Sequence, residues 1–251
     1  IAQPVAPVTA PQPSPMPVQP SPLKVYALVI GNGAYPAARL TNPHGDATAM
    51  AERFRRFGFH VTSVLDAGRQ ELVRALAEFS DAAREADVSI VFYAGHGMQV
   101  SGTNYLIPVD LDVSGSRRVS ISLEAVSLDS LLQEHLPGKT RLVFLDACRG
   151  NPLARTLAGV RGSGRGLAPV QASSGTLISY ATRDGGTAAD GDGGNSPYTT
   201  ALLAHLDAAD DIAIVLRRVK QQVMSSTRGR QEPWEYGSLV GDQLILSRLA
   251  R

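Results

Sequence analysis

The chain has 251 residues, of which 43% are hydrophobic and 19% are charged, a size and composition typical of one large or two small globular domains. Its 24 Lys and Arg residues balance 23 Asp and Glu residues, so the net charge of +1 offers no basic surface for nucleic acid or an anionic membrane. No apolar run is long enough to span a membrane, and the single cysteine excludes internal disulfides and cysteine-based zinc sites.

The first part of the chain differs in composition from the rest. Half of the 16 prolines fall within the first 22 residues, where no residue is charged. Such a segment cannot bury a core, so residues 1–23 are predicted to form a Pro-rich disordered tail or linker. Residues 24–251 are predicted to form one folded domain. Because the chain begins with Ile1 rather than Met, we also expect that an upstream segment was removed or not included.

From residue 24 onward, short apolar runs alternate with amphipathic segments of helical length, a pattern typical of βαβ units around a mostly parallel sheet. The apolar runs predict strands at residues 25–30, 59–65, 88–93, 141–147, 176–181 and 243–246. Helical periodicity predicts helices at 47–57, 69–85, 126–135, 197–206 and 211–225. Asp46 is predicted to cap the first helix and Gly58 to end it. Residues 98–122 indicate a hairpin or irregular excursion, and residues 150–175 indicate a long exposed loop.

Two side chains that can act as a nucleophile and a base follow central strands of this predicted sheet. His96 comes directly after the third strand and Cys148 directly after the fourth, so both are expected at the same edge of the sheet. A lone cysteine is more often a small buried hydrophobe, and a lone histidine is more often a satisfied loop residue. Glycines on both sides of His96 and the loop-opening residues after Cys148 favour instead a nucleophile and its base.

Two short motifs resemble the histidine and cysteine boxes of the caspase-like cysteine peptidases, with the metacaspases and bacterial orthocaspases as the nearest groups. They are Tyr93-Ala94-Gly95-His96-Gly97 and Asp146-Ala147-Cys148-Arg149-Gly150, whose His and Cys lie 52 residues apart, against about 50 in the known caspase signature. The resemblance extends over residues 24–246. It implies a caspase-hemoglobinase-like three-layer α/β/α sandwich with a mostly parallel sheet of about six strands.

The resemblance also implies the catalytic roles. Cys148 attacks the scissile carbonyl, and His96 protonates the leaving amine. The backbone N–H groups of Gly97 and Cys148 hold the oxyanion, where one donor is typically worth about 3 kcal/mol of transition-state stabilisation.

In the family, the substrate lies extended beside a strand end that is Ser179, Tyr180 and Ala181 in this chain, held by main-chain hydrogen bonds. Only extended, flexible segments are then cleaved. The predicted loop after Cys148 is such a segment, and we hypothesise that the enzyme cleaves itself there after Arg161 or Arg165.

Specificity is predicted from charge. Asp146 stands two residues before Cys148, where caspases carry glutamine, and side chains two apart on a strand face the same side. A carboxylate there attracts a basic P1 residue by about 4 kcal/mol for charges about 4 Å apart at an effective dielectric of about 20, which favours cleavage after Arg or Lys. Asp46, in a segment that resembles the metacaspases, is a second candidate for this S1 pocket. The alternatives are a structural role for Asp146 and the helix-capping role for Asp46.

No cofactor is predicted, although calcium activation stays open because metacaspases often require that ion. The possible oxygen ligands are Asp110, Asp112, Asp190 and Asp192. The segment 190–195 begins like an EF-hand loop but lacks its Gly at position six and its final Glu. Arg155 also stands where the metacaspase pattern has an acid.

Other functional classes fit the sequence less well. Gly31 and Gly33 match part of a dinucleotide-binding motif whose third glycine is Pro36, and neither a P-loop nor a G-x-S-x-G motif occurs. The alternative to an enzyme is a non-catalytic or latent caspase-like scaffold that binds protein partners through its cleft or Pro-rich tail.

The expected partners are protein or peptide substrates, with no nucleic acid and no membrane span. A monomer is slightly favoured. The compartment stays open between the bacterial cytoplasm and, if a signal segment preceded Ile1, the periplasm or exterior.

Overall fold

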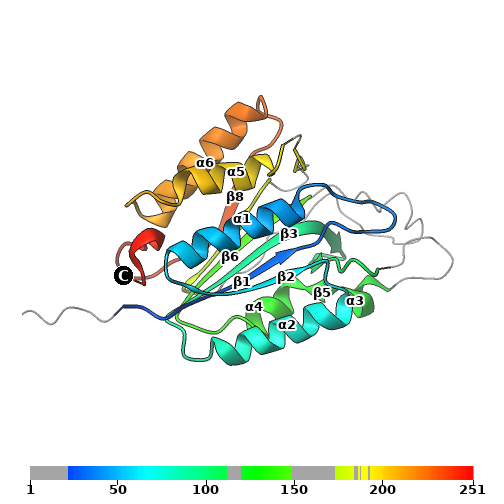
Figure 1. Ribbon diagram of the computed structural model, residues 1–251, viewed down its shortest axis with the longest axis horizontal. Helices are drawn as coiled ribbons and strands as arrows, with labels where there is room; N and C mark the ends of the chain where they lie inside the picture. Colours follow the sequence, from blue (N-terminus) through cyan, green and yellow to red (C-terminus); the bar gives the residue numbers. More distant parts are fainter. Residues whose placement is uncertain are drawn as a thin grey trace, which may run out of the picture.

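The fold is organised by a sheet whose six main strands lie in the order β2-β1-β3-β6-β7-β8 (Figure 1). The computed structural model describes residues 22–111, 120–148, 173–183, 186, 188–191 and 193–250. The main strands are β1 (Val25–Gly31), β2 (His60–Leu65), β3 (Val88–Val100), β6 (Thr140–Cys148), β7 (Thr176–Tyr180) and β8 (Trp234–Ser238). The first five run parallel, and β8 is antiparallel to β7. This arrangement confirms the predicted sheet.

Helices cover both faces of the sheet and complete the predicted three-layer sandwich (Figure 1). One face carries α1 (Pro43–Arg56), α5 (Pro197–His205) and α6 (Ile212–Ser226). The opposite face carries α2 (Arg69–Ala82), α3 (Ile121–Glu124) and α4 (Leu128–Glu134). The short strands β4 (Thr103–Leu106) and β5 (Val126–Ser127) extend the end of β3 by antiparallel pairing.

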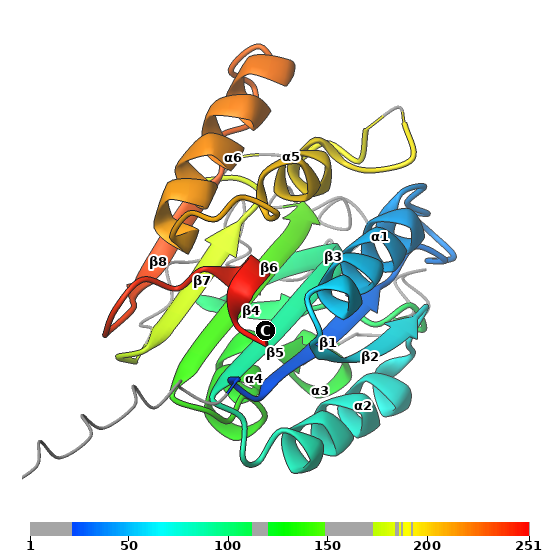
Figure 2. The ribbon, with the colours of Figure 1, turned by 60° about the vertical axis from the view of Figure 1, so that its left-hand side comes forward.

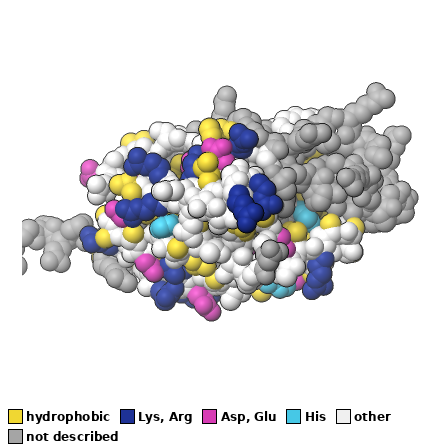
Figure 3. Space-filling model, turned by 90° about the horizontal axis from the view of Figure 1, so that it is seen from above, with side chains coloured by type: hydrophobic (Ala, Val, Ile, Leu, Met, Phe, Trp, Pro, Cys, Tyr) yellow, Lys and Arg dark blue, Asp and Glu magenta, His cyan; other side chains and the backbone are white. Residues whose placement is uncertain are grey.

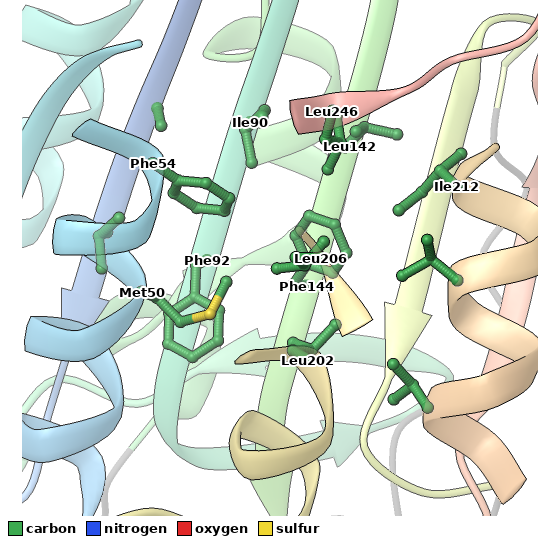
Figure 4. Close-up of a cluster of buried hydrophobic side chains, with 14 of the residues drawn as sticks. Met50, Phe54, Ile90, Phe92, Leu142, Phe144, Leu202, Leu206, Ile212 and Leu246 are labelled. Atoms are coloured by element: carbon green, nitrogen blue, oxygen red, sulfur yellow. The ribbon is translucent and has the colours of Figure 1, made fainter. Parts of the chain in front are cut away.

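The central strands alternate their side chains between two cores, which is why their sequences are almost wholly apolar. On β3, Ile90 and Phe92 pack with α1, α5 and α6 (Figure 4). The intervening Val91 and Tyr93 pack with α2 and α4. The same alternation along β6 places Asp146, which is two residues beyond Phe144, on the α1 and α5 side.

The start of α1 differs from the prediction. The helix begins at Pro43 rather than Ala47, because proline has the φ angle of a first helical residue and needs no hydrogen bond for its missing N–H. Asp46 therefore lies in the first turn instead of capping the helix, and the N-cap residue is Asn42. Gly58 does follow the helix end, with φ of +87°, as predicted.

Two strand predictions are also corrected. β3 does not stop before His96 but continues to Val100, because its last residues find a new antiparallel partner in β4. The last strand is β8 rather than residues 243–246. Residues 243–245 have no regular secondary structure, and a single turn of 3-10 helix, Leu246–Arg248, follows them. The sequence did not predict β8 because a glycine, Gly237, ordinarily argues against a strand interior. In the structure this glycine has φ of +128°.

The surface over α5 and α6 carries charges of both signs. Lys and Arg side chains are scattered among acidic and neutral ones on the face that Figure 3 shows. Among the described helices, none combines the length and apolar character needed to cross a membrane.

Gly237 should be essential for docking β8 onto β7. A Cβ atom at this position would lie 2.0 Å from the carbonyl oxygen of Thr176. Gly237→Ala should therefore lower the free energy of unfolding by about 3 kcal/mol, measured by urea denaturation. The control is Gly241→Ala, which also has a positive φ of +108° but no atom within 4 Å. It should cost about 1 kcal/mol, and equal losses in both variants would contradict the steric explanation.

Candidate active site

The pairing of β3 with β6 brings the two predicted catalytic residues to the same point of the sheet. His96 and Cys148 are direct partners in the parallel register, the last of the pairs that join these adjacent strands (Figure 2). Both residues lie within strands, not after them as predicted. The structure describes the backbone of Cys148, and the loop that follows it lies outside the described residues. Gly97 is the next residue along β3, where the strand pairs with Leu106 of β4.

The imidazole of His96 is oriented by the loop between β1 and α1. Its Nε2 lies 2.6 Å from the carbonyl oxygen of Ala38. Because a carbonyl oxygen only accepts hydrogen bonds, Nε2 must carry the proton, and Nδ1 is the basic nitrogen of the neutral ring. Nδ1 is buried and has no hydrogen-bond partner among the described atoms.

Burial favours the neutral form of this ring. The side chain of His96 is nearly inaccessible to solvent. Desolvation lowers the pKa of His96 below its usual value, and the Ala38 carbonyl and the charge of Asp190 offset part of this effect. The histidine is thus a base rather than a resident cation at neutral pH.

The two predicted S1 carboxylates line one pocket. Asp46 comes from the first turn of α1 and Asp146 from the end of β6. The other residues that line the pocket are Leu40, Pro43, Gly95, Ala188, Ala189, Asp190 and Ser196. The pocket adjoins the predicted catalytic pair, because Gly95 precedes His96 and Asp146 lies two residues before Cys148. Its interior space of about 20 Å³ is close to the requirement of one water molecule.

Hydrogen bonds from the start of α5 hold both carboxylates. Asp46 accepts from the side chain of Asn195 at 3.0 Å and from the N–H of Ser196 at 2.9 Å. Asp146 accepts from the hydroxyls of Ser196 and Thr199, the latter at 2.7 Å. The structural role that was the alternative for Asp146 is therefore present, with side-chain donors, and it coexists with a position in the pocket.

Burial keeps these acids less ionised than ordinary carboxyls. Desolvation raises the pKa of Asp46, and the nearby charge of Asp146 raises it further, against the bonds from Ser196 and Asn195. Desolvation also raises the pKa of Asp146, although the hydroxyls of Ser196 and Thr199 stabilise its ionised form. An incoming cation would restore the ionised state of both groups.

Asp190 lies in this same pocket, although the sequence suggested it as a possible calcium ligand. Its carboxylate accepts from the N–H groups of Thr41 at 2.6 Å and Asn42 at 3.2 Å. Asp110 lies elsewhere and accepts from the N–H of Arg69 at the start of α2. Asp112 and Asp192 lie outside the described residues. Within the described part of the chain, no cluster of three or more His, Cys, Asp or Glu side chains is placed to hold a metal ion.

The lining of the acidic pocket does not include the predicted cleft residues. Ser179, Tyr180 and Ala181 are all buried, and β7 is paired with β6 on one edge and β8 on the other. Ser179 and Tyr180 therefore have no free edge for an added substrate strand. Ala181 lies beyond the pairing with β8, and the role of these residues as a cleft wall stays a prediction. The segment of Ala188, Ala189 and Asp190 lines the pocket instead.

Residues that support the pocket were not predicted, because their hydrogen-bond partners are distant in sequence. The side chain of Gln231 donates to the carbonyl of Ala181 at 2.9 Å and accepts from the N–H of Ala189 at 3.0 Å, which ties the pocket wall to the end of β7. Nothing in the local sequence signals this contact. Ser196 was recognisable as a helix N-cap before Pro197, but its bond to Asp146 was not.

With this geometry established, comparison with known proteins assigns the family. A family model of the caspase domain matches residues 24–244, and the chain belongs to this family of caspase-like peptidases. Over 124 residues the chain is 31% identical to mucosa-associated lymphoid tissue lymphoma translocation protein 1 of Homo sapiens and to its homolog in Mus musculus. These matches cover 49% of this chain but only 15% and 14% of the human and mouse proteins. The finer resemblance to metacaspases and orthocaspases stays a prediction.

Asp46 should make the stability of the protein depend on pH. A carboxyl whose pKa is raised by folding binds its proton more tightly in the native state, so stability falls as pH rises from the unfolded pKa through the folded one. Asp46→Asn removes this loss while keeping an oxygen that accepts hydrogen bonds. We compare the free energy of unfolding of the variant with that of wild type at each pH. This difference should be at least about 1 kcal/mol more favourable to the variant at pH 8 than at pH 4.

Urea denaturation at several pH values measures this effect. The matched control is Asp242→Asn, at an exposed position, which should show no such pH-dependent gain. If the free energy of unfolding depends on pH in the same way for wild type and Asp46→Asn, folding does not raise the pKa of Asp46 and the prediction is wrong.

Proposed function

We propose that the protein is a cysteine endopeptidase that cleaves extended peptide segments after Arg or Lys through His96 and Cys148. One observation carries the proposal: three carboxylates, of Asp46, Asp146 and Asp190, line a pocket directly beside the paired His96 and Cys148. No other class of P1 side chain is as complementary to that pocket as a cation.

In the proposed reaction, Nδ1 of His96 takes the proton of the Cys148 thiol and the sulfur attacks the scissile carbonyl carbon. The N–H groups of Gly97 and Cys148 stabilise the resulting oxyanion. His96 then gives the proton to the leaving amine, which departs and leaves an acyl-enzyme. A water molecule, deprotonated by His96, attacks the thioester and restores the thiol. The Ala38 carbonyl keeps Nε2 protonated, and so supports this role for Nδ1.

The charge of the pocket supports selection of a basic P1 residue. The guanidinium of Arg or the ammonium of Lys would pair with carboxylates that burial otherwise keeps partly protonated. An acidic P1 side chain would add a fourth negative group to the same small volume. The pocket is narrow, so entry of a long side chain requires the wall of Ala188, Ala189 and Asp190 to move away from Leu40 and Pro43.

The same narrowness favours one alternative function. A pocket with room for about one water molecule fits a latent or non-catalytic caspase-like scaffold that binds protein partners. In that case the acidic residues preserve the fold of the site and turn over no substrate.

Turnover of fluorogenic peptides that differ only at P1 tests the proposal. Peptides with Arg or Lys at P1 should be cleaved at least about 100-fold faster than those with Asp or Ala, because of the charge of the pocket. Asp146→Asn should reduce kcat/KM for the Arg peptide by about tenfold or more. Rates should be the same with calcium and with a chelator.

Two controls separate the possible results. Cys148→Ala provides the blank, and Asp242→Asn is a matched surface substitution that should leave the rates unchanged. Cleavage after Asp would keep the nucleophile but refute the assigned S1 pocket. A folded protein that cleaves none of the peptides would support the latent or scaffold alternative.

Self-cleavage belongs to the same proposal. Arg161 and Arg165 lie outside the described residues, in a segment rich in Gly, Arg and Ser. A cut after either residue of the 26.5 kDa chain should give fragments of about 17 and 10 kDa on a denaturing gel. Cys148→Ala and the double variant Arg161→Ala, Arg165→Ala should both stay whole. Active wild-type enzyme that remains uncut would refute self-cleavage without affecting the peptidase assignment.

A further inference from the structure

Two buried tyrosine hydroxyls meet the backbone of His96 from opposite ends of the residue. Tyr35 lies in the loop after β1, and its hydroxyl oxygen accepts the N–H of His96 at 3.0 Å. Tyr93 lies three residues before His96 on β3, and its hydroxyl donates to the carbonyl of His96 at 2.7 Å. The two hydroxyl oxygens are 3.2 Å apart. Side chains thus bond both main-chain polar groups of the predicted catalytic base.

Counting protons gives one consistent set of hydrogen bonds. The single proton of Tyr93 serves the shorter bond, to His96, and the proton of Tyr35 serves the carbonyl of Ile107 at 2.9 Å. The N–H of Ile107 donates in turn to the carbonyl of His96 at 3.1 Å. Burial raises the pKa of Tyr35 to about 12 and that of Tyr93 well above its usual value, so both hydroxyls keep their protons at neutral pH.

These bonds constrain both groups that the proposed reaction needs. The carbonyl of His96 and the N–H of Gly97 belong to one planar peptide unit. Holding the carbonyl toward Tyr93 and Ile107 therefore directs the N–H of Gly97, the proposed oxyanion donor, to the opposite side. The ring of Tyr35 also packs against the imidazole of His96, with centroids 4.3 Å apart and planes tilted by 48°. That contact limits rotation of the imidazole.

The sequence leaves room for these hydroxyls. A Cβ atom at Gly95 would lie 2.7 Å from the hydroxyl oxygen of Tyr93 and 2.8 Å from that of Tyr35. Only glycine allows the two hydroxyls to approach the backbone so closely. If the rings served packing alone, phenylalanine would fill the same space without burying a polar atom.

We propose that Tyr35 and Tyr93 are positioning residues that aim the imidazole of His96 and the N–H of Gly97 by fixing the two peptide units that flank His96. This inference rests on the proposed peptidase function. Neither tyrosine is assigned contact with the substrate; both act through His96.

Removal of each hydroxyl tests this role. Tyr35→Phe and Tyr93→Phe should each lower kcat for the Arg peptide by about tenfold, with KM changed by less than about twofold. Because the hydroxyls touch each other, the double variant should lose less than the product of the single losses. The matched control is Tyr105→Phe, a buried tyrosine of the same cluster as Tyr35, which should retain the kcat of wild type. Unchanged kcat in both single variants would overturn the proposal.

A second measurement needs no turnover. NMR of the imidazole follows the Nε2 proton of His96, which is assigned by its absence in His96→Gln. This proton should exchange with solvent faster in Tyr35→Phe and Tyr93→Phe than in wild type or Tyr105→Phe, because a mobile imidazole breaks its bond to Ala38 more often. Equal exchange rates would overturn the positioning role. Wild-type protein that exchanges as expected but cleaves no peptide would refute the peptidase function alone.

Discussion

The parallel pairing of β3 with β6 is the constraint on which the rest of the site depends. Its register runs from Val88 opposite Thr140 to His96 opposite Cys148, at the centre of a sheet that is covered on both faces. A slip of one residue would turn every side chain of one strand to the opposite core. The register that keeps each side chain in its own core therefore also places His96 opposite Cys148.

The same register makes the pocket possible. Asp146 points to the α1 and α5 side of the sheet, where the start of α5 supplies donors that offset part of the cost of burying a carboxylate. Ser196 links the N-terminus of α5 to the pocket. Its hydroxyl oxygen accepts the N–H of Thr199 at 2.9 Å and so caps the helix, and the same hydroxyl donates its proton to Asp146. The start of α5 and the acidic pocket are thus one hydrogen-bonded unit, which explains how these carboxylates are tolerated in a buried position.

Membership in the caspase-domain family agrees with a site built partly from sheet strands and partly from loops. The family match spans residues 24–244 and so includes every main strand and all the residues that line the pocket. The strands supply His96, Cys148 and Asp146, and the loops supply the Ala38 carbonyl and the wall at Ala188 and Ala189. Loops of this kind tolerate sequence change more readily than the buried strands, so relatives that share the sheet need not share the pocket wall.

The sequence by itself determined the layered fold, and it predicted the catalytic pair and the two acids that the structure places near it. Each of these rests on local signals: apolar runs, glycines around His96, and the Asp-Ala-Cys box. Only the tertiary structure decided that Asp190, Ala188 and Ala189 line the acidic pocket and that Tyr35 and Gln231 support the site. Those contacts join residues separated by between 42 and 149 positions. The physical reason is that hydrogen bonds between distant loops leave no periodic pattern, whereas burial of a strand or helix face does.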